Sequence, residues 1–324
     1  MRPLVDGLGR EHTYLRVSVT DRCNFRCVYC MPADGFDWMP RDELLRYEEI
    51  ARLVRIFASM GVKRVRLTGG EPLIRRDLES LVEELGRIEG LTDIAMTTNA
   101  HRLAGCAEQL AKAGMTRINV SIDSLDPERF KELTRGGSLK KVLEGIEAAV
   151  QAGLTPVKLN AVILKGVNED ELFPLVERFS GPEYVLRFIE YMPFEARWHR
   201  CIPARELRER LRQRWSMEPL GERLGDGPSV AWRLSNGARV GFISPITENF
   251  CERCNRLRLM ADGHLRTCLS DDGTPSLREF LREGADDAQI EEAIRAMVMT
   301  KRAGHDATET GAGVFEGVMT RVGG

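Results

Sequence analysis

The feature that most restricts the fold of this 324-residue chain is a regular alternation of strand-like and helix-like segments from residue 14 to residue 214. The strand-like segments are short and rich in β-branched residues, whereas the helix-like segments repeat apolar residues every three or four positions. The predicted strands are Tyr14–Thr20, Lys63–Thr68, Asp93–Thr98, Arg117–Ile122, Pro156–Leu164 and Tyr184–Glu190. The predicted helices are Asp42–Met60, Leu78–Ile88, Leu103–Ala113, Leu139–Ala152, Glu169–Phe179 and Ala204–Arg214. Such a succession of βα units requires a parallel sheet with helical crossovers, built either as a partial barrel or as a doubly wound sheet.

Beyond about residue 215 this alternation gives way to hairpin signals. One hairpin is predicted around an Asn-Gly turn, and the second around an Asp-Gly pair. Their strands are Val230–Leu234 with Arg239–Ile243, and Arg256–Leu259 with His264–Thr267, and the helices that follow are Leu277–Leu281 and Gln289–Val298. The change predicts two domains, residues 1–215 and a smaller one over 216–324. The polar, Gly-rich stretch 304–324 predicts an extended or mobile arm.

Three cysteines with C-x3-C-x2-C spacing, Cys23, Cys27 and Cys30, follow the first predicted strand. Three thiolates this close together can hold three irons of a four-iron cluster and leave the fourth iron open to an outside molecule. The same i, i+4, i+7 spacing also fits one buried face of a helix. Zinc is a further alternative, although a structural zinc site needs four ligands and no histidine is near. Because Asn24 and Arg26 interrupt the cysteines, we favour a metal site over a buried face.

A second set of three cysteines, Cys251, Cys254 and Cys268, lies in the C-terminal part. Two thiolates fall on one turn and the third at the end of the following hairpin, again with no obvious fourth ligand. Zinc with His264 as its fourth ligand is one alternative. A redox pair within the C-x2-C motif is another, although no thioredoxin-like context surrounds it. Two separate sets of three cysteines are a more specific signal than either set alone.

Composition limits the classes of function. The chain is 43% hydrophobic and 30% charged, as expected of a soluble globular protein. Its net charge of −2 gives no general basic field, so a bound polyanion needs a local cluster of Arg and Lys. No apolar run approaches the roughly 20 residues of a membrane span, and the N-terminus lacks the apolar core of a signal peptide. We therefore expect a cytoplasmic protein that binds neither nucleic acid nor membrane.

Eight cysteines in such a protein indicate metal or thiol chemistry and not a disulfide framework. Cys106 and Cys201 have no partner at ligand spacing, and we interpret both as structural.

The segment Gly69–Pro72 (Gly-Gly-Glu-Pro) ends the second predicted strand, where two glycines let the backbone approach a ligand closely. The carboxylate of Glu71 could accept a hydrogen bond from a ligand ammonium group. Gly-Gly turns are common, so this segment alone is a weak signal.

Catalytic groups of such folds lie at the carboxyl ends of the parallel strands. Several segments with polar residues fall there: Cys23–Cys30, Gly69–Pro72, Thr97–Asn99, Ser121 and Glu190–Met192. The first cysteine loop, with Tyr29 before its last cysteine, and the Gly-Gly-Glu-Pro segment resemble the radical S-adenosylmethionine (SAM) enzymes. The resemblance narrows to the family of molybdenum cofactor biosynthesis protein A, the GTP 3′,8-cyclases, and covers essentially the whole chain. The residues that narrow it are Phe250–Leu259, Asp262-Gly263, Leu265–Leu269 and the terminal Gly323-Gly324.

The resemblance implies a partial (βα)6 TIM-like barrel with a C-terminal domain that carries a second cluster. It implies one 4Fe-4S cluster on Cys23, Cys27 and Cys30, whose open iron binds SAM, and another on Cys251, Cys254 and Cys268, whose open iron binds the guanine base of GTP. The implied activity converts GTP to (8S)-3′,8-cyclo-7,8-dihydroguanosine 5′-triphosphate, the first step of molybdenum cofactor biosynthesis. In the family, a 5′-deoxyadenosyl radical abstracts the ribose 3′ hydrogen.

The same resemblance implies contacts for each small molecule. Those to SAM would be made by Tyr29, Gly70, Ser121 and Met192. Those to GTP would be made by Arg16, Arg66, Thr97, Lys158, Arg256, Leu257 and Arg258, of which Arg16, Arg256 and Arg258 are the candidates for catalysis. Arg187 is a further candidate with less support, and the Gly-Gly tail is implied to enter the active site. Physical chemistry agrees, because a triphosphate needs several Arg and Lys side chains that converge from different strands.

The implied partners are a reductant such as flavodoxin or ferredoxin and, for the product, cyclic pyranopterin monophosphate synthase, with the chain a monomer or a homodimer. Two other classes of function remain open. A peptide- or protein-modifying radical maturase with an auxiliary cluster usually has more cysteines in its C-terminal part. A non-catalytic zinc-binding protein would contain zinc and no sulfide.

Overall fold

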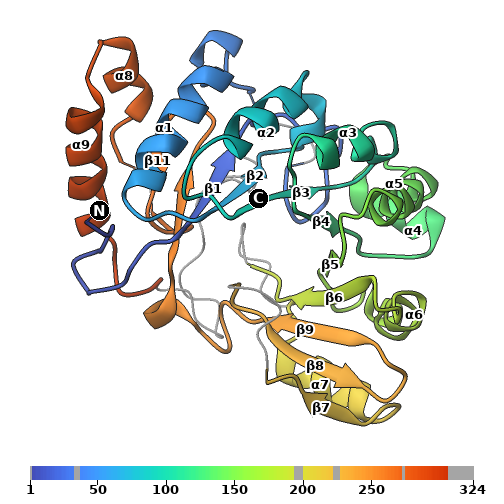
Figure 1. Ribbon diagram of the computed structural model, residues 1–324. Helices are drawn as coiled ribbons and strands as arrows, with labels where there is room; N and C mark the ends of the chain where they lie inside the picture. Colours follow the sequence, from blue (N-terminus) through green and yellow to red (C-terminus); the bar gives the residue numbers. More distant parts are fainter. Residues whose placement is uncertain (1, 33–36, 193–199, 222–226, 272–273, 306–324) are drawn as a thin grey trace.

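A curved sheet of eleven strands is the core of the protein, in the order β11-β10-β1-β2-β3-β4-β5-β6-β9-β8-β7. The computed structural model describes residues 2–32, 37–192, 200–221, 227–271 and 274–305. Figure 1 shows the strands as an arc, with α1, α2, α3, α5 and α6 on its outer side. Among the described residues, no helix is both long and apolar enough to cross a membrane.

The six predicted strands of the N-terminal part are confirmed, and they pair in parallel in the order in which they occur along the chain. They are β1 (Tyr14–Ser18), β2 (Arg64–Thr68), β3 (Asp93–Thr98), β4 (Arg117–Ser121), β5 (Val157–Ala161) and β6 (Tyr184–Ile189). A doubly wound sheet reverses its strand order at a switch point, and these strands do not. The arrangement is therefore a partial barrel, as the family resemblance implies.

The crossover helices bury one apolar face each against the outside of the sheet. They are α1 (Tyr47–Ser59), α2 (Leu78–Gly86), α3 (Ala107–Lys112), α5 (Leu139–Gln151), α6 (Leu172–Arg178) and α7 (Ala204–Arg212), with the short 3-10 turns η2 (Pro72–Ile74) and η4 (Glu169–Glu171). Three predicted helices begin differently from what we expected, and the one over Glu169–Phe179 is divided into η4 and α6. The helix expected from Asp42 begins at Tyr47, since Arg41–Glu43 forms a separate 3-10 turn, η1. The helix expected over Leu103–Ala113 is divided at Cys106 into η3 (Leu103–Gly105) and α3.

One helix was not predicted, α4 (Pro127–Thr134). Its start carries a recognisable signal, since the Asp126 side chain accepts a hydrogen bond from the Arg129 backbone N–H. Pro127 occupies the first turn, where its missing N–H costs nothing. The helix is only eight residues long and mostly polar, so its apolar periodicity is weak.

The C-terminal part extends the same sheet at both edges. Its elements are β7 (Met217–Pro219), β8 (Val230–Leu234), β9 (Arg239–Ile243), η6 (Cys251–Arg253), β10 (Arg256–Leu259), β11 (Leu265–Arg266), α8 (Leu277–Arg282) and α9 (Asp287–Met299). Both predicted hairpins are confirmed, β8 with β9 and β10 with β11, whereas β7 was not predicted. β9 pairs in parallel with β6, and β10 pairs in parallel with β1. The predicted boundary at residue 215 falls between α7 and β7 and stays a prediction.

Candidate functional site

A cavity of about 380 Å³ lies on the concave side of the sheet, and both sets of cysteines line it. Most of the predicted SAM and GTP contacts line the same cavity, although their strands are far apart in the sequence. These residues are Arg16, Tyr29, Arg66, Gly70, Thr97, Ser121, Lys158, Met192, Arg256 and Arg258, together with Arg187. Leu257 does not line it, since its side chain is fully buried in the hydrophobic core. A contact between Leu257 and GTP would have to involve its backbone.

The loop of Cys23, Cys27 and Cys30 follows β1 and is held by the backbone after β2. The Gly70 N–H donates to the Thr20 carbonyl and the Glu71 N–H to the Arg22 carbonyl, both at 2.8 Å. Gly69 has a φ of +149°, which side chains rarely allow, and a Cβ on Gly70 would overlap the Arg22 carbonyl oxygen. We expected these two glycines to let the backbone approach a ligand closely. In the structure, the backbone at these glycines closely approaches the chain that leads into the cysteine loop. A contact of Gly70 with SAM stays a prediction.

We predict that Gly70→Ala lowers stability and weakens iron binding by the first cysteine loop. The added methyl group forces the chain after β2 away from Arg22, and overpacking of this kind costs about 1–3 kcal/mol. Gly105→Ala is the matched control, because nothing lies within 4 Å of a Cβ at that position. Thermal unfolding and iron analysis of both variants test the prediction. An unfolding temperature of Gly70→Ala equal to that of the parent would contradict it.

The carboxylate of Glu71 ties the ends of β2 and β3 together. It accepts hydrogen bonds from the Asn99 N–H at 2.7 Å, the Thr98 hydroxyl at 2.6 Å and the Leu73 N–H at 3.0 Å. Burial raises the pKa of Glu71 to about 7. These hydrogen bonds give the buried Glu71 carboxylate a structural role within the folded chain. A contact between Glu71 and a ligand ammonium group stays a prediction.

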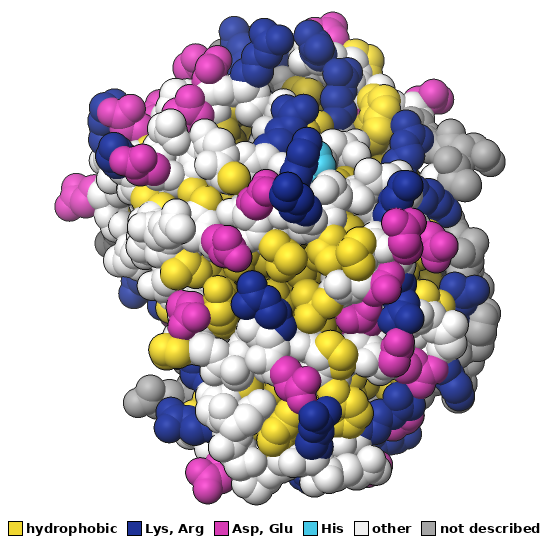
Figure 2. Space-filling model, turned by 90° about the vertical axis from the view of Figure 1, so that its right-hand side faces the viewer, with side chains coloured by type: hydrophobic (Ala, Val, Ile, Leu, Met, Phe, Trp, Pro, Cys, Tyr) yellow, Lys and Arg dark blue, Asp and Glu magenta, His cyan; other side chains and the backbone are white. Residues whose placement is uncertain are grey.

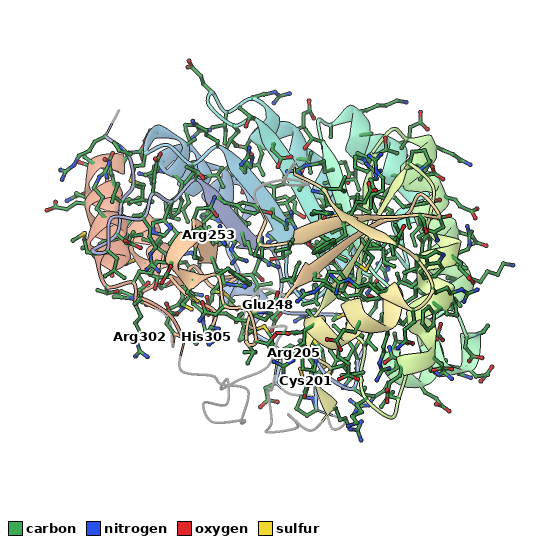
Figure 3. All side chains as sticks on the ribbon, turned by 90° about the horizontal axis from the view of Figure 1, so that it is seen from below. Cys201, Arg205, Glu248, Arg253, Arg302 and His305 are labelled. Atoms are coloured by element: carbon green, nitrogen blue, oxygen red, sulfur yellow. The ribbon has the colours of Figure 1, made fainter. Side chains whose placement is uncertain are left out.

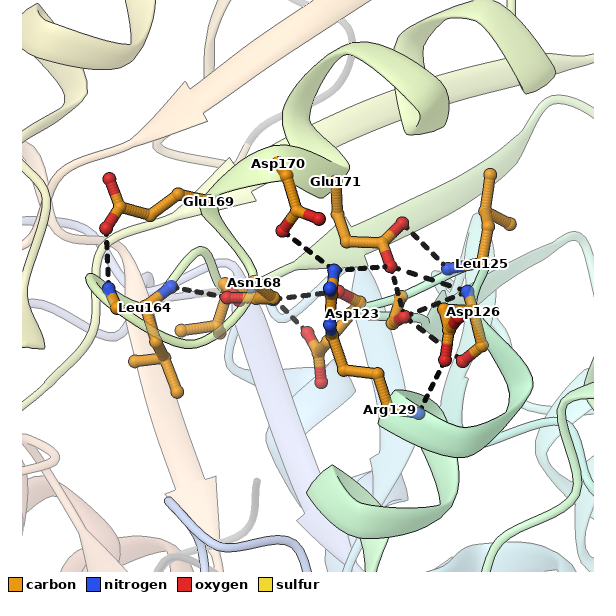
Figure 4. A network of polar contacts seen from close by, with 12 residues as sticks. Asp123, Leu125, Asp126, Arg129, Leu164, Asn168, Glu169, Asp170 and Glu171 are labelled. Carbon is orange, nitrogen blue, oxygen red and sulfur yellow. Dashed lines mark hydrogen bonds and ion pairs between the residues drawn. The ribbon is translucent and has the colours of Figure 1, made fainter.

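Tyr29, directly before Cys30, is held by a buried carboxylate that we did not identify from the sequence. Its hydroxyl donates to Asp123 Oδ2 at 2.5 Å, and the Val162 N–H donates to Asp123 Oδ1 at 2.8 Å. Asn168 donates to the Asp123 carbonyl, and Figure 4 shows the network continuing toward Glu171. Burial raises the pKa of Asp123 to about 6. The position of Asp123 just after β4, at the carboxyl end of a strand, is the signal that could have identified it.

The second cysteine set lies at the opposite end of the barrel from the first. Cys254 precedes β10, whose first residue, Arg256, lies beside Tyr14 at the start of β1. Cys268 follows β11, which runs antiparallel to β10. The first set thus lies at the carboxyl ends of the strands and the second at their amino ends. We expected the chemistry to lie at the carboxyl ends of the strands, and of the two cysteine sets only the first lies there.

The arrangement of donors fits a cluster better than a single zinc ion. All eight cysteines are free thiols. In the described part of the chain, no three His, Cys, Asp or Glu side chains converge on one ion. His264, considered as a zinc ligand, is outside the cavity lining, and its Nδ1 lies 3.1 Å from Asp262 Oδ1. A four-iron cluster spreads its thiolate ligands around a cube, whereas zinc gathers four ligands at one point.

The two cysteine sets differ in their electrostatic surroundings. Burial raises the pKa of Cys23 to about 12, and burial, Cys30 and the carboxylate of Asp123 raise the pKa of Cys27 well above its ordinary value. Burial also acts to raise the pKa of Cys254, but the charges of Arg256 and Lys301 outweigh it, so the pKa is lowered. The protein itself therefore stabilises the thiolate of Cys254, whereas burial raises the pKa of Cys251, and the thiolates of Cys23 and Cys27 depend more on the charge of a bound metal.

Between the two cysteine sets, basic side chains line the wall of the cavity. The strand register places Arg258 of β10 beside Arg16 of β1, and Arg16 beside Arg66 of β2. Lys158 of β5 and Arg187 of β6 also line the cavity. Burial and neighbouring guanidinium groups lower the pKa of Lys158 to about 6 and that of Arg187 to about 9. Lys158 and Arg187 are buried and the other three are half-buried, and cations brought together in this way favour the binding of an anion.

Three carboxylates line the described part of the cavity, and each accepts hydrogen bonds from other groups. Glu190 accepts hydrogen bonds from the Ala204 N–H and from Thr247, while Glu71 and Asp123 are used as described above. The Nε atoms of Arg66 and Arg187 are buried without a hydrogen-bond partner in the part of the chain that the structure describes. On the face shown in Figure 2, charges of both signs are mixed around a central group of hydrophobic side chains. The basic cluster expected for a polyanion is therefore found inside the cavity.

The remaining candidates lie elsewhere. Cys106 and Cys201 do not line the cavity, and Cys201 forms an isolated bridge with Leu164. The terminal Gly323-Gly324 lies outside the described residues. His305, close to the end of the described chain, lines the cavity, and its Nε2 lies 2.8 Å from the Pro245 carbonyl oxygen. Figure 3 shows His305 in the lower half of that view, in the region of Glu248.

Two family models match successive parts of the chain. The model of the radical SAM superfamily matches residues 17–179, and the model named Molybdenum Cofactor Synthesis C matches residues 184–307. Curated relatives match over most of the chain. A Paracoccus denitrificans protein named GTP 3′,8-cyclase is 46% identical over 94% of this chain and 90% of its own length. A Moorella thermoacetica protein of the same name is 43% identical over 93% of this chain and 94% of its own.

A relative from Bos taurus, named molybdenum cofactor biosynthesis protein 1, is 43% identical over 93% of this chain and 48% of its own length. Among solved structures, Streptococcus suis SuiB bound to the precursor peptide SuiA has a TM-score of 0.58 at 17% identity, over 88% of this chain and 67% of that one. SuiB bound to S-adenosylmethionine has a TM-score of 0.57 at 15% identity, over 92% of this chain and 70% of that one. At such low identity the likeness concerns the fold alone.

Proposed function

This chain belongs to the radical SAM superfamily and, within it, to the GTP 3′,8-cyclase family of molybdenum cofactor biosynthesis, and we propose that it converts GTP to (8S)-3′,8-cyclo-7,8-dihydroguanosine 5′-triphosphate. The proposed reaction removes the 3′ hydrogen of the ribose and joins C3′ to C8 of guanine. Membership of the superfamily supports SAM and one 4Fe-4S cluster as cofactors. The second cluster is part of the proposal.

Cys23, Cys27 and Cys30 would hold the first cluster at the carboxyl ends of the strands. Bound there, a reduced cluster supplies one electron for the cleavage of SAM into methionine and a 5′-deoxyadenosyl radical. The protein's part is to position SAM beside the open iron and to exclude water. We assign Tyr29, Gly70, Ser121 and Met192 to this task, and Asp123 supports it by fixing the Tyr29 hydroxyl.

We infer that GTP lies between the two cysteine sets. Arg16, Arg66, Lys158, Arg187 and Arg258 would bind the triphosphate from different strands, and guanidinium groups can donate two parallel hydrogen bonds to a phosphate. The same cations stabilise negative charge on the substrate, so Arg16, Arg258 and Arg256 are also our candidates for catalysis. Thr97 and the backbone at Leu257 would complete the contacts.

The second set, Cys251, Cys254 and Cys268, would hold a cluster whose open iron binds the guanine base. The base would then be anchored near the amino ends of the strands, at the far end of the cavity from the SAM site. This arrangement places the ribose, which lies between base and triphosphate, within the stretch that separates the two cysteine sets. We propose no role in catalysis for Cys106 or Cys201.

The observation that carries this proposal is the row of buried and half-buried cations between two sets of free thiols in one cavity. A peptide-modifying enzyme of the same fold has no need for so many buried positive charges along this wall. A zinc-binding protein needs a closed set of four ligands, which the described residues do not form.

We predict that the reduced enzyme forms 5′-deoxyadenosine from SAM in a GTP-dependent manner. The anaerobically purified protein should contain about eight irons and about eight sulfides per chain, four of each for every cubane cluster. Chromatography of the reaction mixture measures 5′-deoxyadenosine and the cyclised nucleotide, with ATP in place of GTP as the control. A rate that a peptide stimulates and GTP does not, or zinc without sulfide, would contradict the assignment.

The reaction also needs partners that the chain does not supply. We propose that a flavodoxin or a ferredoxin delivers the electron and that cyclic pyranopterin monophosphate synthase consumes the product. Whether the chain acts as a monomer or as a homodimer can be measured by analytical ultracentrifugation of the iron-loaded protein.

A further inference from the structure

A buried lysine lies behind the second cysteine set, outside the cavity lining. Lys301 follows the C-terminus of α9, and only 5% of its surface is exposed. Its ammonium group donates hydrogen bonds to the Arg256 carbonyl at 3.1 Å and to the Thr267 carbonyl. None of the roles assigned above uses this residue.

The two carbonyl groups belong to the segments that carry two of the three thiols. Arg256 is two residues after Cys254, and Thr267 directly precedes Cys268. One ammonium group therefore joins the chain on both sides of the β10–β11 hairpin and restrains the separation of these two cysteines. Cysteines on separate segments need such a restraint, since a cluster accepts its ligands only within a narrow geometry.

Arg10 holds the backbone at the third cysteine of the set, Cys251, in a comparable way. Its Nη1 donates to the Cys251 carbonyl at 2.9 Å, and its Nη2 donates to the Arg302 carbonyl at 2.7 Å. Figure 3 shows Arg302 in the lower half of that view, next to His305. Arg10 differs from Lys301 in its charge balance, because its Nε lies 2.7 Å from the carboxylate of Asp6.

Lys301 has no such counter-charge. Among the described residues, no carboxylate lies within ion-pairing distance of it. Burial lowers the pKa of Lys301, whereas thiolates at Cys254 and Cys268 favour its charged form. A buried ammonium group without an anionic neighbour is costly. A thiolate-bound iron–sulfur cluster carries negative charge and would provide that neighbour.

We propose that Lys301 is a positioning residue of the second cysteine set, whose ammonium group fixes the Cys254 and Cys268 segments and offsets the negative charge of a cluster bound there. The inference deepens the proposed function and rests on its second cluster. Reduction adds negative charge to a cluster, so a nearby fixed positive charge favours the reduced form. Lys301 should therefore raise the reduction potential of the second cluster.

Three substitutions separate the two roles of this residue. Lys301→Met removes both the hydrogen bonds and the charge, Lys301→Gln keeps two N–H donors without the charge, and Lys301→Arg keeps both. Each is made in the full chain and also in a background with Ser at positions 23, 27 and 30, where only the second set can bind a cluster. The readouts are iron and sulfide content and a redox titration followed by electron paramagnetic resonance.

In the serine background we expect the parent and Lys301→Arg to bind about four irons per chain. Lys301→Met should bind at most a fifth of that amount. Lys301→Gln should bind iron but show at least a tenfold lower equilibrium constant for one-electron reduction, a fall of about 59 mV in the midpoint potential. Loss of iron from Lys301→Gln with retention by Lys301→Arg would also support the role of the charge.

Arg10→Gln is the matched control. It removes part of the brace on Cys251, but the charge of Arg10 is already balanced by Asp6, so we expect lower iron content without a shift in potential. Thermal unfolding shows whether each variant folds, and if Lys301→Met does not, the Gln and Arg variants decide. Full iron content in Lys301→Met or Lys301→Gln, with the potential of the parent, overturns the inference. A parent that binds no iron in the serine background refutes the second cluster itself, and the inference with it.

Discussion

Cys27→Ser should abolish SAM cleavage with or without GTP. Cys27 is the central cysteine of the first loop and its thiol is buried, so a serine hydroxyl there cannot replace a thiolate ligand of the cluster. Without the first cluster, no electron reaches SAM. We expect 5′-deoxyadenosine below the detection limit and an iron content that falls by about half.

Cys254→Ser should act differently, because it removes a ligand at the opposite end of the barrel. The slow SAM cleavage measured without GTP should persist, while its stimulation by GTP, the affinity for GTP and the yield of cyclised product should fall sharply. The two variants thus separate the radical source from the substrate anchor. Equal loss of all SAM cleavage in both would contradict the proposed division of labour.

A control for both variants is Cys106→Ser. Cys106 lies at the start of α3, outside the cavity lining, where its thiol donates to backbone carbonyls of its own turn and packs against the core. Iron content, SAM cleavage and GTP turnover should all equal those of the parent. Anaerobic assays of the three proteins in parallel distinguish loss of a ligand from a general effect of replacing cysteine.

The parallel sheet of the N-terminal part was predictable because its signals are local. Each strand is a short β-branched run next to a helix with regular apolar spacing, and the bounds of β3 agree with the predicted Asp93–Thr98. The position of β10 was not predictable. The alternation in Arg256–Leu259 indicates a strand with one buried face, but no local signal identifies β1 as its partner. That pairing is what moves the second cysteine set to the amino ends of the strands.

The candidate site likewise contains residues that the sequence could identify and residues that only the fold reveals. The thiols and most basic residues could be predicted, because their residue types and motifs already indicate their chemistry. Lys301 and Arg10 could not, since their importance comes from burial and from hydrogen bonds that only the folded chain provides. Leu257 illustrates the reverse case, as its neighbours on β10 line the cavity while its own side chain belongs to the core.

The basic wall of the cavity leads to the second large effect, which we expect from Arg66→Met. Arg66 lies beside Arg16 in the strand register, and its Nε is buried without a partner in the described chain. Loss of a hydrogen bond to a charged phosphate costs about 1.5–3 kcal/mol, so the dissociation constant of GTP should rise roughly 10- to 100-fold. Equilibrium dialysis with the iron-loaded protein measures it.

Arg117→Met is the matched control, because Arg117 also lines the cavity but is ion-paired with Asp93. Its substitution should change the affinity for GTP little, while the stability falls because a half-buried ion pair loses one partner. Arg66→Met should instead raise the unfolding temperature of the GTP-free protein. The charge of Arg66 repels that of Arg187 and, together with burial, lowers the pKa of Arg187. The substitution removes this repulsion. The two substitutions therefore have opposite effects on stability and unequal effects on binding. If both weakened binding equally, Arg66 would have no special part in holding the triphosphate, and the basic wall would act only as a diffuse field.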